Sequence, residues 1–229
     1  MSVSPWTAAA VAVYPSRDFP EGPPSRYMLF DEVPRMGGLD MAVEVAPARR
    51  RFTRAEYHRM AEVGILADGE RVELICGEIL KKLTQGRRHR AFVDNLTQLL
   101  VPQLAGRAIV SIQMPVALSD DTEPEPDVQI LRRRSVPYKE REGDASDAFL
   151  VIEVADSSLT YDRTTKLKLY AAAGIPEYWV VDCVAESIEV HRGPSADGYR
   201  DVTRVAGPAA TIAPQAFPDV TLALTEIFA

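Results

Sequence analysis

Apolar residues recur at helical spacing in three stretches of the chain. Residues Thr53 to Val63 begin with Thr-Arg-Ala-Glu, which has the form of a capping box, so a helix is predicted to begin there. Between Arg88 and Leu104 the apolar positions fall three and four residues apart, as on the buried side of an amphipathic helix. A third helix is predicted over residues 160–173, followed by Gly174 as a stop signal. Its buried side is expected to hold Leu167, Tyr170 and Ala171.

Strands are predicted between and after these helices. Residues 71–81 contain two short alternating runs around Cys76-Gly77, the pattern of a β-hairpin, with Glu73 on the face opposite its two neighbours. The other predicted strands cover residues 108–118, 127–131, 148–154, 176–182, 187–191 and 199–205. The tail from Phe217 to Phe228 is expected to close one end of the core. This mixture predicts an α/β or α+β domain with a central mixed β-sheet flanked by helices.

The first 46 residues differ from the rest of the chain. They carry scattered prolines and glycines, and their apolar residues follow neither a two-residue nor a helical period. We therefore expect a Pro-rich, flexible extension over residues 1–46. Because no linker interrupts the patterned part that follows, a single folded domain is predicted over residues 47–229.

Composition and charge narrow the class of protein. At 229 residues and 46% apolar content, the chain is long enough to bury one sizeable core. A net charge of -7 argues against general, non-specific electrostatic binding of a polyanion. No apolar run approaches the roughly 20 residues needed to cross a bilayer, so we expect no membrane partner. Cys76 and Cys183 are far apart and in no zinc-binding spacing, which favours a reducing, cytoplasmic location.

Two carboxylates and a lysine form the candidate chemical site. Glu153 lies inside the apolar run Leu150-Val-Ile-Glu-Val154, where a carboxylate is costly to bury unless it is paired, hydrogen-bonded or bound to a cation. Asp127 begins the neighbouring predicted strand, and Lys166 lies in the helix that follows. Oxygen ligands of this kind suit a hard divalent cation such as Mg²⁺. The chain lacks a glycine-rich phosphate loop, a His-Glu-x-x-His motif and a Gly-x-Ser-x-Gly elbow.

Each of these residues also has an ordinary structural interpretation. Asp127 follows a proline in an acidic turn, where solvated carboxylates are common. Glu153 could pair with a buried basic residue, and Glu73 could face solvent on the hairpin. Asp162 could be a helix-start acid favoured by the helix dipole, and His89 could cap or pack at its own helix start.

Basic and aromatic residues leave similar alternatives. Arginines at 87, 88, 90 and 132–134 could contact phosphates or could form a solvated surface. Tyr178 and Trp179 lie in an apolar strand and are predicted to be core residues rather than a platform for base stacking.

Several motifs, in order, resemble a known family. They are Val72-Glu-Leu-Ile-Cys-Gly-Glu-Ile79, His89, Pro126-Asp127, Leu150-Val-Ile-Glu-Val154, Asp162-x-x-x-Lys166 and Tyr170-Ala-Ala-Ala-Gly-Ile-Pro-Glu-Tyr-Trp-Val-Val-Asp182. Together with the Leu-rich tail they resemble the Uma2 family (DUF820), which is assigned to the PD-(D/E)XK nuclease superfamily. The likeness runs from about Phe52 to Phe228. It implies a restriction-endonuclease-like core and Mg²⁺-dependent hydrolysis of DNA phosphodiester bonds, with Mn²⁺ as a possible substitute.

The resemblance also implies roles for individual residues. Asp127, Glu153 and Glu73 would be the metal-binding carboxylates, and Lys166 would be the signature lysine. The superfamily pattern places that lysine two residues after the second acid, where this chain has Ala155. Lys166 and Lys168 in the following helix can replace it. We favour Lys166, because it lies four residues after Asp162 and so on the same side of a helix.

The function expected on this basis is a Mg²⁺-dependent DNA endonuclease, which could act as a homodimer. One alternative is a nuclease-like domain that binds nucleic acid or protein without catalysis, and the acidic net charge and displaced lysine favour it. A structural or oligomerisation domain is a third alternative, which predicts neither metal nor DNA binding.

Overall fold

The computed structural model describes residues 49–229, apart from residues 83, 135–137 and 139–142. The Pro-rich extension predicted over residues 1–46 lies outside the described residues, and so does much of the loop predicted over 135–147. Residues Pro47–Ala229 form one compact unit, which contains every element discussed below.

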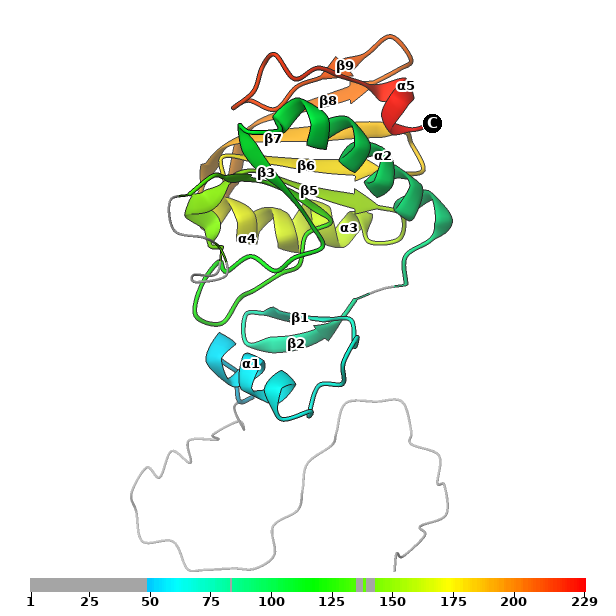
Figure 1. Ribbon diagram of the computed structural model, residues 1–229. Helices are drawn as coiled ribbons and strands as arrows, with labels where there is room; N and C mark the ends of the chain where they lie inside the picture. Colours follow the sequence, from blue (N-terminus) through cyan, green and yellow to red (C-terminus); the bar gives the residue numbers. More distant parts are fainter. Residues whose placement is uncertain (1–48, 83, 135–137, 139–142) are drawn as a thin grey trace, which may run out of the picture. The chain divides into compact units, whose positions relative to one another are not determined.

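A six-stranded sheet with the strand order β3-β4-β5-β6-β7-β8 forms the centre of this unit (Figure 1). Neighbouring strands are antiparallel except β5 and β6, which are parallel and joined by a helical crossover. This arrangement confirms the predicted α/β class and central mixed sheet. The strands are β3 (Ala108–Ile112), β4 (Val128–Arg132), β5 (Ala148–Ala155), β6 (Glu177–Asp182), β7 (Ser187–Ser195) and β8 (Gly198–Ala206).

Helices cover both faces of the sheet, and β5 shows why. Side chains alternate along a strand, so Leu150, Ile152 and Val154 all join the core beneath α2 (Arg87–Leu104). Val151 and Ala155 point the other way and pack with the crossover helix. Glu153 therefore lies on the crossover side of the sheet.

The crossover between β5 and β6 differs from the single helix predicted over residues 160–173. It consists of α3 (Leu159–Tyr161), a π-helical turn (Asp162–Lys166) and α4 (Leu167–Ala172). A π-helical turn is wider than an α-helical one and is frequent at functional sites. Tyr170 and Ala171 are buried as predicted, Leu167 is partly buried, and Asp162 and Lys166 are also buried.

A helix and a β-hairpin precede the sheet. The helix α1 (Arg54–Glu62) begins with the predicted capping box of Thr53 and Glu56. The hairpin consists of β1 (Val72–Ile75) and β2 (Glu78–Lys81), as predicted. Cys76 and Gly77 form its turn with φ values of 48° and 75°, as a type I′ turn requires. The backbone amide of Glu123 donates to the Leu74 carbonyl and connects the hairpin to the segment before β4.

Two further comparisons with the predicted elements concern β3 and the tail. The strand predicted over 108–118 is too long, because Gln113 has a φ of 50° and ends the extended backbone after Ile112. The tail forms β10 (Leu222–Ala223), paired with β9 (Thr211–Ile212), and α5 (Leu224–Ile227). Its apolar side chains enter the core beneath α2, as predicted.

Within the described part of the chain, no helix is long and apolar enough to cross a membrane.

Candidate active site

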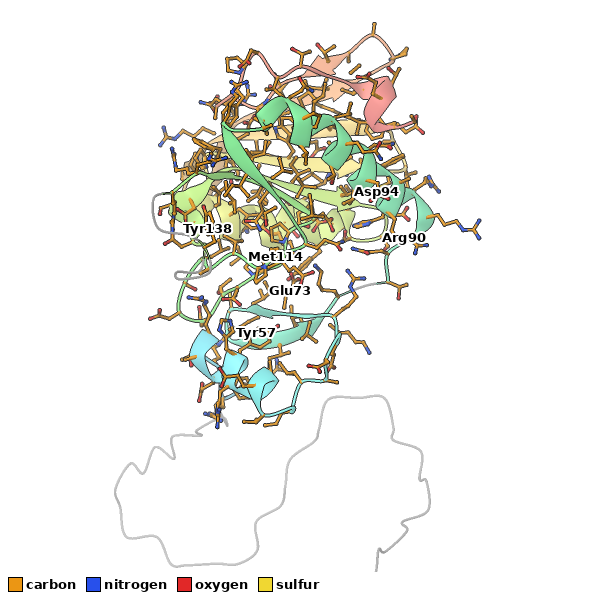
Figure 2. The ribbon with its side chains drawn as sticks, viewed as in Figure 1. Tyr57, Glu73, Arg90, Asp94, Met114 and Tyr138 are labelled. Atoms are coloured by element: carbon orange, nitrogen blue, oxygen red, sulfur yellow. The ribbon has the colours of Figure 1, made fainter. Side chains whose placement is uncertain are left out.

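A cavity of about 310 Å³ opens between the hairpin, the start of α2, the carboxyl end of β5 and the crossover. The four residues singled out from the sequence, Glu73, Asp127, Glu153 and Lys166, all line it. Figure 2 labels Glu73 on the hairpin. Lys168 does not line the cavity and is exposed on α4. The geometry therefore brings Lys166, rather than Lys168, to the acids.

Glu153 lies at the bottom of the cavity and is 4% exposed. Its Oε1 atom accepts hydrogen bonds from Lys166 Nζ at 2.9 Å and from the Tyr170 hydroxyl at 2.7 Å. Burial raises the pKa of Glu153 to about 8, Lys166 opposes this rise, and neighbouring acids, Asp162 first, add to it. Glu153 thus pairs with a buried basic residue, as one alternative expected. It also accepts a hydrogen bond from Tyr170 and lies near other acids, so a simple pair does not describe its surroundings fully.

Lys166 connects two of the acids. Its Nζ atom lies 3.3 Å from Glu73 Oε2 as well as 2.9 Å from Glu153 Oε1. Burial by itself lowers the pKa of this lysine, but Glu153, Glu73 and the nearby Asp162 outweigh burial and raise it. Lys166 is therefore an ammonium ion that donates hydrogen bonds inside the cavity. Glu73 is 5% exposed, so the alternative that it faces solvent is wrong.

Asp127 directly precedes β4, and two groups contact its carboxylate. Its Oδ2 atom accepts from the Val154 amide at 2.9 Å and lies 3.0 Å from His89 Nε2. Burial raises the pKa of Asp127, but the His89 hydrogen bond and charge outweigh this and lower it. The alternative of a solvated turn carboxylate is wrong, because pairing of β4 with β5 brings Asp127 against Val154. His89 is buried and bonded to Asp127, so it does more than pack at a helix start.

Asp162 is a fourth acid in the cavity. It is 2% exposed and accepts a hydrogen bond from the Ser158 hydroxyl at 2.5 Å. Burial raises its pKa to about 6, while Lys166 and Ser158 oppose the rise. Asp162 does lie in the first turns of the crossover, as the helix-start interpretation expected, but it is buried in the cavity. Its four-residue spacing from Lys166 already indicated that both would lie on one side, and both line the cavity.

The candidate arginines divide into two groups. Arg87, Arg88 and Arg90 are exposed on the first turn of α2, and Figure 2 labels Arg90 there. Arg132 stacks over the Phe149 ring at 4.2 Å, and Arg134 forms an ion pair with Asp147. Arg132 and Arg134 thus have partners within the chain, and Arg88 Nη1 also donates to the Cys183 carbonyl at 3.5 Å. Tyr178 and Trp179 are fully buried core residues, as predicted.

The donor chemistry of the cavity fits a hard divalent cation. Glu73, Asp127 and Glu153 each use one carboxylate oxygen in the close contacts given above. Among the described residues, the second oxygen of Asp127 has a long contact of 3.5 Å from Gln113. Asp162 also lies near the Lys166 ammonium. The basic residues Arg71, Lys81 and Lys82 line the same cavity, so it is the carboxylate oxygens, rather than net charge, that favour a cation there. Among the residues that the structure describes, however, no three potential ligands are already grouped as a metal site. Metal binding would therefore require some side chains to move.

The described residues form an α/β domain with an acidic cavity beside its central sheet. The sequence model of the Uma2 family, described as "Putative restriction endonuclease", matches residues 54–225, and the chain belongs to this family. The crystal structure of a "putative nuclease belonging to DUF820" from Anabaena variabilis ATCC 29413 is similar in fold. It has a TM-score of 0.57 at 18% sequence identity, covering 69% of this chain and 89% of that one. A comparison with curated proteins gave no match.

Proposed function

We propose that this protein is a Mg²⁺-dependent endonuclease that hydrolyses phosphodiester bonds in DNA. The observation that supports this most directly is the meeting of Glu73, Asp127, Glu153 and Lys166 in one cavity. These residues come from the hairpin, the start of β4, the end of β5 and the crossover. They are far apart in the chain, so the fold brings them together. Membership of the Uma2 family supports a nuclease-like function independently of this geometry.

Glu73, Asp127 and Glu153 would hold the Mg²⁺ ion, and Mn²⁺ could replace it, since both accept carboxylate oxygens. When bound, the ion would supply Lewis-acid polarisation of a phosphoryl oxygen and would make a water molecule more acidic. The hydrogen bonds from Val154 and His89 would keep the Asp127 carboxylate in a fixed orientation. The Tyr170 hydroxyl would do the same for Glu153.

Lys166 would act as a charged donor rather than as a base. Its raised pKa keeps it protonated at neutral pH, so it cannot accept a proton from an attacking water. It can orient that water through a hydrogen bond and stabilise negative charge that develops on the phosphoryl oxygens. Both roles require the ammonium to stay beside the acids, which its contacts with Glu153 and Glu73 ensure.

Binding without catalysis is the second candidate function, and one observation favours it. The Lys166 ammonium already lies between Glu153 and Glu73, so it offsets part of the negative charge that would otherwise attract a metal ion. The net charge of -7 also weakens a general grip on DNA.

Cleavage of DNA by the full chain tests the proposal. Supercoiled plasmid, single-stranded DNA and a branched DNA would each be incubated with Mg²⁺, Mn²⁺ or EDTA. Metal-dependent nicking by the wild type, lost in Lys166→Ala and kept in Lys168→Ala, is the expected result. Lys168 is the matched control, because it lies in the same crossover but is exposed and outside the cavity. Binding of DNA without cleavage under all metal conditions would instead establish the second candidate.

A further inference from the structure

The amino-terminal end of α2 is capped differently from that of α1. In α1 the side chain of Thr53 accepts a hydrogen bond from the Glu56 amide, and Glu56 reaches back to the Thr53 amide. In α2 the position before the helix is Gly86, which has no side chain and so provides no capping hydrogen bond. The amides of the first three residues of α2 therefore lack both an intrahelical acceptor and a capping side chain.

The charges on the first turn of α2 make this end unusual. A helix start carries partial positive charge and favours acidic side chains. The first turn of α2 contains no acid, and its residues are Arg87, Arg88, His89 and Arg90. These side chains add positive charge where the helix already has an excess. An anion bound at this position would relieve the repulsion and accept hydrogen bonds from the free amides.

Gly86 explains why the chain supplies no cap of its own. A Cβ atom at this position would lie 2.3 Å from Asp156 Oδ2, so a side chain at the capping position would have to displace the Asp156 carboxylate. The Asp156 carboxylate lies beside Gly86. This carboxylate, in the segment that follows β5, therefore lies close to the start of α2.

Buried polar atoms without partners independently indicate a ligand in the same cavity. His89 Nδ1, Gln85 Nε2 and the Tyr161 hydroxyl have no hydrogen-bond partner among the described residues. All three residues line the cavity together with Gly86, and His89 is 7% exposed. Buried polar groups of this kind are normally satisfied by protein, water or a ligand. Gln85 Nε2 is a donor, and burial raises the pKa of Tyr161 to about 12, so its hydroxyl also remains a donor.

We propose that the start of α2, with Gln85 and Tyr161, forms a phosphate-binding subsite beside the acidic residues of the cavity. In this subsite the free amides of α2, Gln85 Nε2 and the Tyr161 hydroxyl donate to phosphate oxygens, and the arginines of the first turn add attraction from the rim. The assignment of that phosphate to a DNA strand rests on the proposed function. The phosphate would then be a neighbour of the one that is cleaved, and the subsite would position the strand over the acids.

Amide NMR of the ¹⁵N-labelled full chain in EDTA tests the subsite without any cleavage. Inorganic phosphate and a short single-stranded DNA oligonucleotide would be titrated separately. We expect both to shift the amide signals of Arg87, Arg88 and His89. The capped first turn of α1 serves as the internal control and should not respond. Absence of a response to both probes would overturn the subsite, and a response to phosphate alone would overturn its assignment to DNA.

Matched variants add a quantitative test. Gln85→Glu replaces a donor by a carboxylate of the same shape, and we expect roughly ten- to hundred-fold weaker oligonucleotide binding. Gln98→Glu makes the same charge change at an exposed position of the same helix and should bind as the wild type does. Asp156→Asn removes the negative charge beside Gly86 and should strengthen binding. Equal effects of Gln85→Glu and Gln98→Glu would show a general charge effect and would overturn the subsite.

The two proposals fail in different ways. A protein that cleaves no DNA but binds phosphate at α2 would retain the subsite and lose the endonuclease function. A protein that cleaves DNA but shows no response at α2 would retain the function and lose the subsite. Gln85→Met, which removes the donor without adding charge, checks that the effect of Gln85→Glu does not come from misfolding.

Discussion

Lys166 Nζ lies 2.9 Å from Glu153 Oε1, although the first residue belongs to the crossover and the second to the strand before it. Both side chains are nearly inaccessible to solvent, at 4% exposure each. A buried ion pair of this kind adds little net stability compared with an apolar pair, but removal of one partner is costly. It therefore indicates a role beyond stability for the site around it.

Replacement of Lys166 by methionine should destabilise the fold in a pH-dependent way. Loss of one member of a buried pair costs about 3–5 kcal/mol when the other stays charged. The pKa of Glu153 is already raised to about 8, and without the lysine it should rise further. The pKa of this carboxyl group is higher in the folded protein than its value of about 4.3 in the unfolded chain. The resulting stabilisation of the fold is fully present below about pH 4.3, and it is lost as the pH rises towards the pKa of the folded state.

Urea denaturation at pH 5 and pH 8.5 measures this effect. Lys166→Met should lose more stability relative to wild type at the higher pH, and Lys168→Met should match wild type at both. A loss for Lys166→Met that is the same at both pH values would show that Glu153 is not the group left unpaired.

Substitution of Asp127 by asparagine should weaken metal binding. Asp127→Asn keeps the size of the side chain and removes its negative charge, so we expect roughly ten- to hundred-fold weaker binding of Mn²⁺. Calorimetric titration of the full chain measures the affinity. Asp94→Asn, an exposed change on α2, is the control. Equal Mn²⁺ affinity in Asp127→Asn and wild type would contradict the proposed ligand set.

Removal of the Tyr170 hydroxyl should cost stability with little change in packing. Tyr170→Phe deletes the donor to Glu153 Oε1 in a fully buried position, and the expected loss is about 1–3 kcal/mol. Urea denaturation measures this loss. The variant should also weaken Mn²⁺ binding, because Glu153 would lose a group that orients it. A stability change within the error of the measurement would show that this hydrogen bond adds nothing to the fold.

His191 should make the fold sensitive to acid. Burial lowers the pKa of His191 below its usual 6.5, although Glu189 opposes the change. The folded state therefore favours neutral histidine, and the unfolded state binds the proton more readily. Stability should fall as the pH is lowered through about 6.5.

Thermal unfolding between pH 7.5 and pH 5 tests this prediction. His191→Gln, which cannot titrate, should show a smaller loss than wild type over the same range. Because several acids also titrate towards pH 5, the comparison between the two proteins is the informative quantity. Parallel pH profiles would exclude His191 as a source of acid sensitivity.

Much of the fold and most of the site residues could be predicted from local sequence. The capping box at Thr53, the hairpin turn at Cys76-Gly77 and the apolar strand that contains Glu153 depend on residues a few positions apart, and the structure contains all three. The acid in the apolar strand could be recognised because a carboxylate there needs a partner. The end of β3 was missed, since a left-handed Gln113 leaves no clear local signal.

The sequence by itself determined most of the main helices and strands, which strand faces are apolar and which acids need an explanation, because these properties arise from neighbouring residues along the chain. Only the tertiary structure decided that Glu73 on the hairpin shares the Lys166 ammonium with Glu153, that His89 holds Asp127, and that the start of α2 stays uncapped beside them. These relationships join residues far apart in the chain, so they depend on how strands pair and helices pack. The π-helical turn that carries Asp162 and Lys166 also appears only in the structure, because the sequence pattern predicted a single regular helix there.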